Sequence, residues 1–160
     1  MALSPSDPNS HSRPDLFQSV SLHFDWDIDF DAQKVVGEVQ ILLRRQVDGK
    51  NCRELVLDMN MLTIDWVQAG HHDDPSKRKL EFSVGPPGSC GSRLDIRLPE
   101  DLDQEDEVTL LIRYSTSPES PALLWLSPEQ TSGGGHPFVF SQGQVSSGTL
   151  LLYRDGQCVS

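Results

Sequence analysis

Two glutamines that flank a glycine, Gln142-Gly143-Gln144, are the residues of this chain best suited to bind a ligand. They follow the strand-length apolar run Phe138–Phe140, which comes after a glycine-rich turn and Pro137. A carboxamide donates and accepts hydrogen bonds at once, so it matches a peptide unit without adding charge. Gly143 lets a ligand approach the backbone closely. The triplet predicts a peptide-binding strand end; the open alternative is that two polar residues simply end a strand.

No motif of a complete enzyme accompanies these glutamines. The chain has no Gly-x-Ser-x-Gly elbow, no phosphate loop ending in Gly-Lys-Ser/Thr and no His-Glu-x-x-His zinc motif. The glycines Gly133–Gly135 precede a proline and a strand rather than a helix, which favours a flexible turn over a phosphate site. We therefore expect no catalytic residue, no metal ligand and no cofactor bound by this chain itself.

Two stretches rich in acidic residues or histidines invite a metal-site interpretation. In Asp25–Asp31 aspartates alternate with large apolar residues, so a strand would carry its carboxylates on one face, about 6.6 Å apart. Calcium needs six to eight converging oxygens, which a flat ladder does not supply, so we predict a solvated face. His71-His72-Asp73-Asp74 lacks the spacing of paired metal ligands and predicts an exposed loop.

Composition indicates one globular domain of 160 residues, with 36% hydrophobic and 23% charged residues. Thirteen basic against twenty-four acidic residues give a net charge of −11, which argues against nucleic acid or an anionic membrane as a partner. No apolar run approaches the ~18 residues that span a bilayer, and the N-terminus has no signal-peptide pattern. The three cysteines show no metal-ligand spacing and indicate free thiols in a reducing compartment, so we expect a cytoplasmic protein.

Alternating apolar and polar residues predict an all-β fold, an antiparallel-rich β-sandwich or saddle-shaped sheet. Residues 23–31 and 35–45 read as a hairpin whose aromatic residues point inward and whose aspartates point outward. Trp125 and Tyr114 are predicted to be core or interface aromatics. Residues 1–15, with three prolines and few apolar side chains, predict a flexible arm. Further strands are predicted at residues 54–58, 62–67, 80–84, 94–98, 108–114, 122–126 and 138–140.

The stretch from Trp125 to Gln144 resembles a segment of the gluzincin zinc aminopeptidases of the leukotriene-A(4) hydrolase and aminopeptidase B type. The resemblance rests on a Trp-Leu-x-Pro-Glu-Gln-Thr run, a glycine-rich turn, a proline–aromatic pair and Gln-x-Gln in this order. Those elements are uncommon residues at fixed spacing over twenty positions. Across the remaining part of about Val20 to Gln144 the resemblance is diffuse, because its strands are of a common kind.

The resemblance implies that residues 16–144 form the N-terminal β-domain of such an enzyme. In the complete protein this saddle-like domain would pack against a zinc metallopeptidase domain, with Gln142, Gly143 and Gln144 lining the substrate cleft. The implied activity is removal of N-terminal residues from peptides, with or without epoxide hydrolysis. Zinc is the implied cofactor of the complete protein, and a peptide is its implied substrate.

After Gln144 the sequence departs from the family pattern, which calls for an arginine and then Phe-Pro-Cys-x-Asp-x-Pro. We expect residues 145–160 to be a non-family tail and the domain to be incomplete at its C-terminal end. Gln144-Val145-Ser146 matches an in-frame splice donor, so a retained intron is one hypothesis for the tail. Without His-Glu-x-x-His the chain is expected to be inactive alone. Uncovered apolar surface is expected to bind a protein partner or drive self-association; the alternative function is a non-catalytic β-sandwich binding module or a regulatory short isoform.

Overall fold

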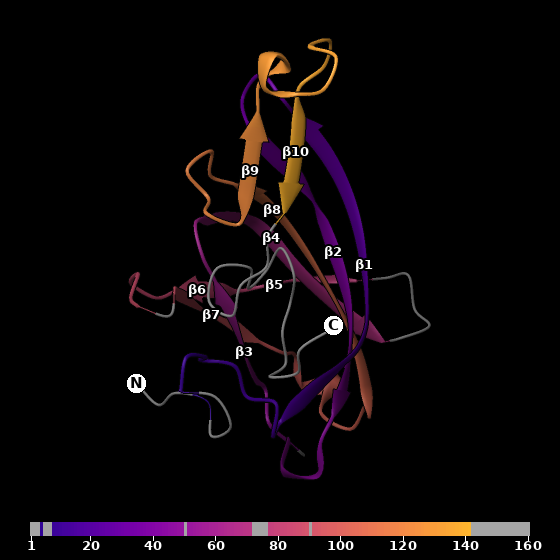
Figure 1. The fold of residues 1–160 in the computed structure, drawn as a ribbon. Coiled ribbons are helices and arrows are strands. Elements are labelled where there is room, and N and C mark those ends of the chain that lie inside the picture. The colour runs from indigo at the N-terminus through magenta and orange to yellow at the C-terminus, as the bar shows by residue number, and fades with distance from the viewer. Residues whose placement is uncertain (1–3, 5–7, 50, 72–76, 90, 142–160) are drawn as a thin grey trace.

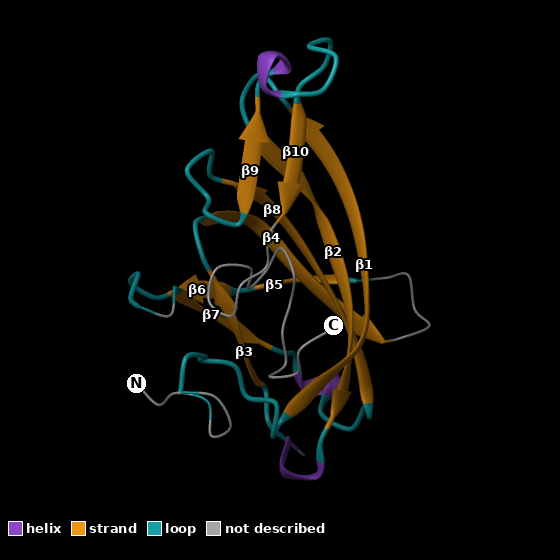
Figure 2. Ribbon diagram, in the orientation of Figure 1, coloured by secondary structure: helices purple, strands orange, loops and turns teal. Residues whose placement is uncertain are grey.

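The computed structural model describes residues 4, 8–49, 51–71, 77–89 and 91–141 of the chain. These residues form strands and short 3-10 helices, and every strand pairing among them is antiparallel, so the predicted all-β, antiparallel fold is confirmed (Figure 2). None of the helices in these ranges is long and apolar enough to cross a bilayer. The strands are β1 (Phe17–Asp29), β2 (Lys34–Arg45), β3 (Glu54–Met59), β4 (Leu62–His71), β5 (Arg78–Leu80), β6 (Phe82–Val84), β7 (Ser92–Arg97), β8 (Glu107–Thr116), β9 (Leu123–Leu126) and β10 (Phe138–Ser141).

Five strands make the larger sheet, in the order β1-β2-β8-β4-β5 (Figure 1). The predicted hairpin of β1 and β2 is present, with Phe24 opposite Val39. Val39 also pairs with Ile112 of β8, and Ile112 pairs with Val67 of β4, so one apolar row crosses four strands. Val39, Ile112 and Val67 are all 0% exposed. Alternation with a period of two therefore places one face of each central strand in the core.

A second sheet of three strands, in the order β3-β7-β6, covers that face. Leu57 of β3 pairs with Leu94 of β7, and both lie in one buried cluster with side chains of the larger sheet. Residues 80–84, predicted as a single strand, are divided between the two sheets. Leu80 pairs with Val67 in the larger sheet, and Phe82 pairs with Ile96 in the smaller one. The chain thus changes sheets within two residues, which joins the two layers of the sandwich.

Strand β1 is the edge of the larger sheet, and its apolar row is only partly covered. Phe24 and Trp26 are half-buried against the core, whereas Ile28 is 45% and Phe30 38% exposed. The prediction that all the aromatic and aliphatic residues of 23–31 point into the core is therefore wrong at its far end. The aspartates of the same strand are exposed, as predicted.

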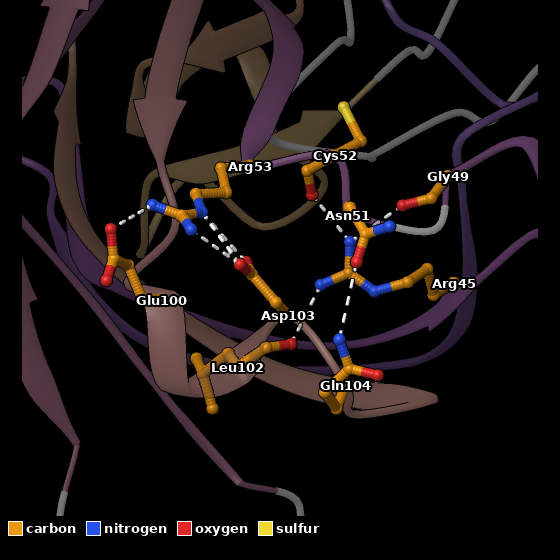
Figure 3. Close-up of polar contacts among 9 residues, drawn as sticks. All are labelled: Arg45, Gly49, Asn51, Cys52, Arg53, Glu100, Leu102, Asp103 and Gln104. Atoms are coloured by element: carbon orange, nitrogen blue, oxygen red, sulfur yellow. Dashed lines mark hydrogen bonds and ion pairs between the residues drawn. The ribbon is translucent and has the colours of Figure 1, made fainter.

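Arg45, at the end of β2, is buried and holds several connections together (Figure 3). Its guanidinium donates to the carbonyl oxygens of Gly49 at 2.9 Å, Cys52 at 2.5 Å and Leu102 at 2.9 Å. It also donates to the Glu105 carbonyl at 3.2 Å. Five N–H donors in a planar fork can satisfy several carbonyls at once. One side chain therefore binds the loop after β2 to the connection between β7 and β8.

Residues 10–12, predicted to belong to a flexible arm, lie against β3 (Figure 1). Ser10 and Ser12 are 9% and 3% exposed. Their hydroxyl and amide groups are used in hydrogen bonds, which explains how a segment without large apolar side chains packs at all. The flexibility of residues 1–15 as a whole stays a prediction.

Candidate functional site

Gln142, Gly143 and Gln144 lie outside the described residues, which end at Ser141 of β10. The structure therefore shows β10, the strand that precedes the predicted substrate-binding triplet. β10 pairs with β9 in a separate two-stranded sheet, with Ser141 opposite Leu123. Leu123 is 8% exposed and belongs to the core. The chain consequently leaves β10 at the end of the hairpin that is anchored in the core.

One face of this hairpin packs on the body of the domain. Trp125 and its cross-strand partner Val139 both lie against the core cluster. The Trp125 ring also meets Phe30, at the turn between β1 and β2, edge-to-face with 5.7 Å between centroids. Of the two aromatics predicted to lie in the core or at an interface, Tyr114 is 0% exposed within the core and Trp125 is half-buried against it. These contacts set the hairpin at the end of the larger sheet (Figure 1).

The motif between the two strands builds a closed tip. After Ser127 the chain forms the 3-10 helix η3 (Pro128–Gln130), and the Ser127 N–H donates to Oε1 of Gln130 at 2.9 Å. This is the side-chain contact of a capping box. The Thr131 hydroxyl lies 2.8 Å from the Pro128 carbonyl oxygen and 2.9 Å from that of His136. A hydrogen bond from Ser127 holds the pKa of the Glu129 carboxyl below its ordinary value. Ser127, Pro128, Gln130 and Thr131 thus each stabilise the tip of the hairpin.

A hollow of about 590 Å³ opens at this tip. Leu126, Pro137, Phe138 and the glycine-rich turn line it. Gly133 and Gly134 have φ values of +98° and +62°, which glycine adopts without strain, so the predicted turn is confirmed. The lining is Leu126, Gln130, Thr131, Ser132, Gly133, Gly135, His136, Pro137 and Phe138.

The other face of the hairpin is apolar and exposed. Phe138 pairs with Leu126, and Phe140 pairs with Leu124. Phe138 is 54%, Leu124 45% and Phe140 40% exposed, and the two phenylalanine rings lie 6.4 Å apart. A hairpin that is apolar on both faces is typical of a strand pair covered on both sides. We call these four residues the outer hairpin face.

No group of three or more histidine, cysteine or acidic side chains arranged for a metal ion occurs among the described residues. His71, at the end of β4, instead lies 3.2 Å from a carboxylate oxygen of Glu105 and 4.0 Å from one of Asp101. The side chain of His71 is 40% exposed. His72 to Asp74 lie outside the described residues. A zinc ion therefore finds no ligand set in the part of the chain that the structure describes.

Two structurally central polar residues were not anticipated from the sequence, Arg45 and Asp58. Both are buried, at 9% and 5% exposure. Their partners are backbone groups and hydroxyls from segments far away in the chain, so no local spacing marks them. Arg45 and Asp58 each stand at the end of a predicted strand, where a charged residue gives no sign of burial.

A scan of protein-family models finds no match for this chain. Leukotriene A-4 hydrolase of Xenopus laevis is 34% identical over 142 residues, which is 88% of this chain and 22% of the relative. Leucine aminopeptidase 2 of Yarrowia lipolytica is 37% identical over 140 residues, 87% of this chain and 20% of the relative. Native leukotriene A4 hydrolase of Saccharomyces cerevisiae superposes with a TM-score of 0.77 at 28% identity, over 89% of this chain and 22% of that one.

Over about 88% of its length the chain is homologous to the N-terminal part of leukotriene A4 hydrolase and related aminopeptidases. Its fold is that of the N-terminal β-domain of leukotriene A4 hydrolase. The yeast enzyme in complex with bestatin gives the same result, with a TM-score of 0.74 at 28% identity. The chain spans about one fifth of the length of these relatives. The family resemblance predicted from the sequence is thereby confirmed for the chain as a whole.

Proposed function

We propose that this chain is the substrate-lining N-terminal β-domain of a leukotriene A4 hydrolase-like zinc metallo-aminopeptidase. Gln142, Gly143 and Gln144 would contact the N-terminal part of a peptide substrate. The observation that carries the proposal is the homology over 88% of the chain to leukotriene A-4 hydrolase. The Trp125–Gln144 motif lies in the same chain and ends in the triplet.

The hairpin supports a positioning role for the triplet. β10 is held by β9 through four residue pairs, and its Val139 packs on the core, so the chain reaches residue 142 from a fixed strand. Binding groups carried by a rigid element lose less entropy when they meet a ligand. Carboxamides then pair with peptide N–H and C=O groups without introducing charge into a cleft.

Catalysis requires groups that the described residues do not supply. They hold no ligand set for zinc, so zinc and the general base would come from sequence of the kind that the longer relatives possess. The chain alone is then inactive toward peptides and epoxides. Removal of N-terminal residues, and epoxide hydrolysis where the family member performs it, would belong to the complete protein.

The outer hairpin face supports contact with another protein surface. Leu124, Phe138 and Phe140 are each at least 40% exposed on one face of a short sheet. We assign this face to the contact with the metallopeptidase domain, since covering it removes apolar side chains from water. The same exposure favours the second candidate function, a non-catalytic binding module or regulatory isoform that uses this face for a separate partner.

A cytoplasmic location is part of the proposal. Cys52 is a free thiol in the structure, and the sequence has an odd number of cysteines. Free thiols are typical of reducing compartments.

A domain-exchange experiment tests the proposed function. Residues 16–144 replace the equivalent segment of Saccharomyces cerevisiae leukotriene A4 hydrolase, and hydrolysis of a leucyl chromogenic substrate is measured with zinc. We expect activity in the chimera and none in the isolated 160-residue chain. A correctly folded, zinc-loaded chimera without activity would count against the proposal. Partner binding by the isolated chain that survives Gln142→Ala and Gln144→Ala would support the binding-module alternative instead.

A further inference from the structure

The outer face of β3 carries a buried carboxylate. β3 pairs with β7 so that Val56 lies opposite Asp95, and Asp58 lies opposite Arg93. Arg93 and Asp95 are half-exposed and bond to each other, with Nε of Arg93 2.6 Å from Oδ1 of Asp95. Val56 and Asp58, in contrast, are each 5% exposed. Something therefore covers the β3 half of this face and leaves the β7 half open.

The cover at Asp58 is the N-terminal segment. The Ser10 hydroxyl donates to Oδ2 of Asp58 at 2.5 Å, and the His11 N–H donates to Oδ1 at 2.6 Å. The Ser12 N–H donates in turn to the Ser10 hydroxyl oxygen at 3.0 Å. Both oxygens of one carboxylate are therefore bonded to consecutive residues of the segment. Hydrogen bonds to an ionised acceptor are the stronger kind.

The segment is attached to the domain by a separate turn. The N–H groups of Leu16 and Phe17 both donate to the Arg13 carbonyl oxygen, at 3.0 Å and 3.1 Å. Phe17 is 2% exposed and begins β1, and Arg13 bonds to Asp15. Movement of residues 10–12 therefore does not require β1 to leave its sheet.

We propose that residues 10–12 form a releasable strap over the outer face of β3, with Asp58 as its anchor. Residues 10–12 are Ser-His-Ser and carry no aliphatic side chain, so hydrogen bonds, chiefly those to Asp58, hold them against β3. Release would expose the Asp58 carboxylate on β3, an edge strand of its sheet. The strap thus controls exposure of one edge of the sandwich, independently of the proposed peptidase role.

Amide hydrogen exchange of the full chain tests the strap. In the unmodified chain we expect protected amides at His11 and Ser12. Asp58→Ala is expected to speed exchange at both by about 100-fold, because two charge-assisted bonds are lost. Asp58→Asn keeps an acceptor and a donor and is expected to give a smaller increase, of about tenfold. Asp95→Ala, which alters the neighbouring exposed carboxylate on the same face, is the matched control and is expected to leave both amides unchanged.

Exchange at Leu57 and Leu94 reports whether the three-stranded sheet stays folded. Faster exchange confined to His11 and Ser12 supports the strap. The proposal is overturned if these two amides exchange at the rate of an unstructured peptide in the unmodified chain. It is also overturned if Asp58→Asn, with the sheet intact, leaves their exchange unchanged, or if Asp95→Ala releases them equally.

Discussion

The indole N–H of Trp26 donates a hydrogen bond to the phenolic oxygen of Tyr114, with 2.8 Å between the two heavy atoms. The residues lie on β1 and β8, and Gly37 of the intervening β2 is the register partner of both. A Cβ atom on Gly37 would lie 2.5 Å from Cδ1 of Trp26 and 2.3 Å from the Asp25 carbonyl oxygen. The indole therefore reaches across β2 through the space that glycine leaves.

Gly37→Ala is expected to lower the free energy of unfolding by about 3 kcal/mol, because the new methyl group displaces both the indole and the β1 backbone. Urea denaturation measures the change. Gly85→Ala is the control, since its Cβ would lie 3.5 Å from the nearest atom, an ordinary contact, and its effect should stay within about 0.5 kcal/mol. Equal losses of unfolding free energy in the two variants would contradict the conclusion that the Trp26 indole crosses β2 through the space beside Gly37.

Ionisation of Tyr114 is expected to lower the free energy of unfolding at alkaline pH. Burial raises the pKa of Tyr114 to about 12, and the hydrogen bond with Trp26 opposes part of that rise. A folded-state pKa above the unfolded value of about 10 means that the folded protein favours the neutral phenol. Its contribution is complete below about pH 10 and is lost as the pH rises toward about 12. Urea midpoints over this range should fall more steeply for the unmodified chain than for Tyr114→Phe; identical slopes would refute the assignment.

Arg45→Lys is expected to lower the free energy of unfolding by about 3 kcal/mol. A lysine ammonium has a different geometry and cannot reach the carbonyls of Gly49, Cys52 and Leu102 together, so buried acceptors lose their donors. Arg44→Lys is the matched control on the adjacent residue. Arg44 is 54% exposed and pairs with Glu107, so its change should cost less than about 1 kcal/mol. A similar cost for both would show that Arg45 does not bind the loops together.

The outer hairpin face is expected to bind an environment-sensitive hydrophobic dye. Phe138→Ser with Phe140→Ser should reduce dye binding and any concentration-dependent association, and should change the free energy of unfolding by less than about 1 kcal/mol. Val139→Ser alters the opposite face of the same strand, which packs on the core. It should cost about 2 kcal/mol and leave dye binding in place. Dye binding that is unaffected by the phenylalanine changes would place the uncovered surface elsewhere.

Periodicity was sufficient to predict the central strands. In β2 and β8 every second residue is buried and most of these residues are apolar, so local sequence and tertiary pairing agree. At residues 80–84 local sequence and tertiary pairing disagree. Leu80 and Phe82 pair with residues of different sheets, and those residues lie elsewhere in the chain. For Ile28, position on the edge strand β1 rather than residue type decides exposure, and Phe30 lies in the turn that follows this strand. Alternation reports which side chains share a face and leaves open how far the opposite sheet extends.

The hairpin that precedes the candidate site could be predicted from sequence because its motif has structural consequences that residue type reveals. Ser127, Gln130 and Thr131 close the hairpin tip through bonds within a few residues of one another. Arg45 and Asp58 could not be found this way, since their partners come from separate loops and from the N-terminal segment. The role of Gln142, Gly143 and Gln144 stays a prediction.

The most direct measurement is the kcat/KM of the chimera described above for a leucyl peptide substrate, before and after Gln142→Ala with Gln144→Ala. Gln104→Ala is the control, since Gln104 lies on the exposed connection between β7 and β8 and bonds Asn51 (Figure 3). Loss of two carboxamide contacts is expected to lower kcat/KM by about 10- to 100-fold, with zinc content unchanged. A double variant within about twofold of the control would contradict the claim that this domain lines the substrate cleft.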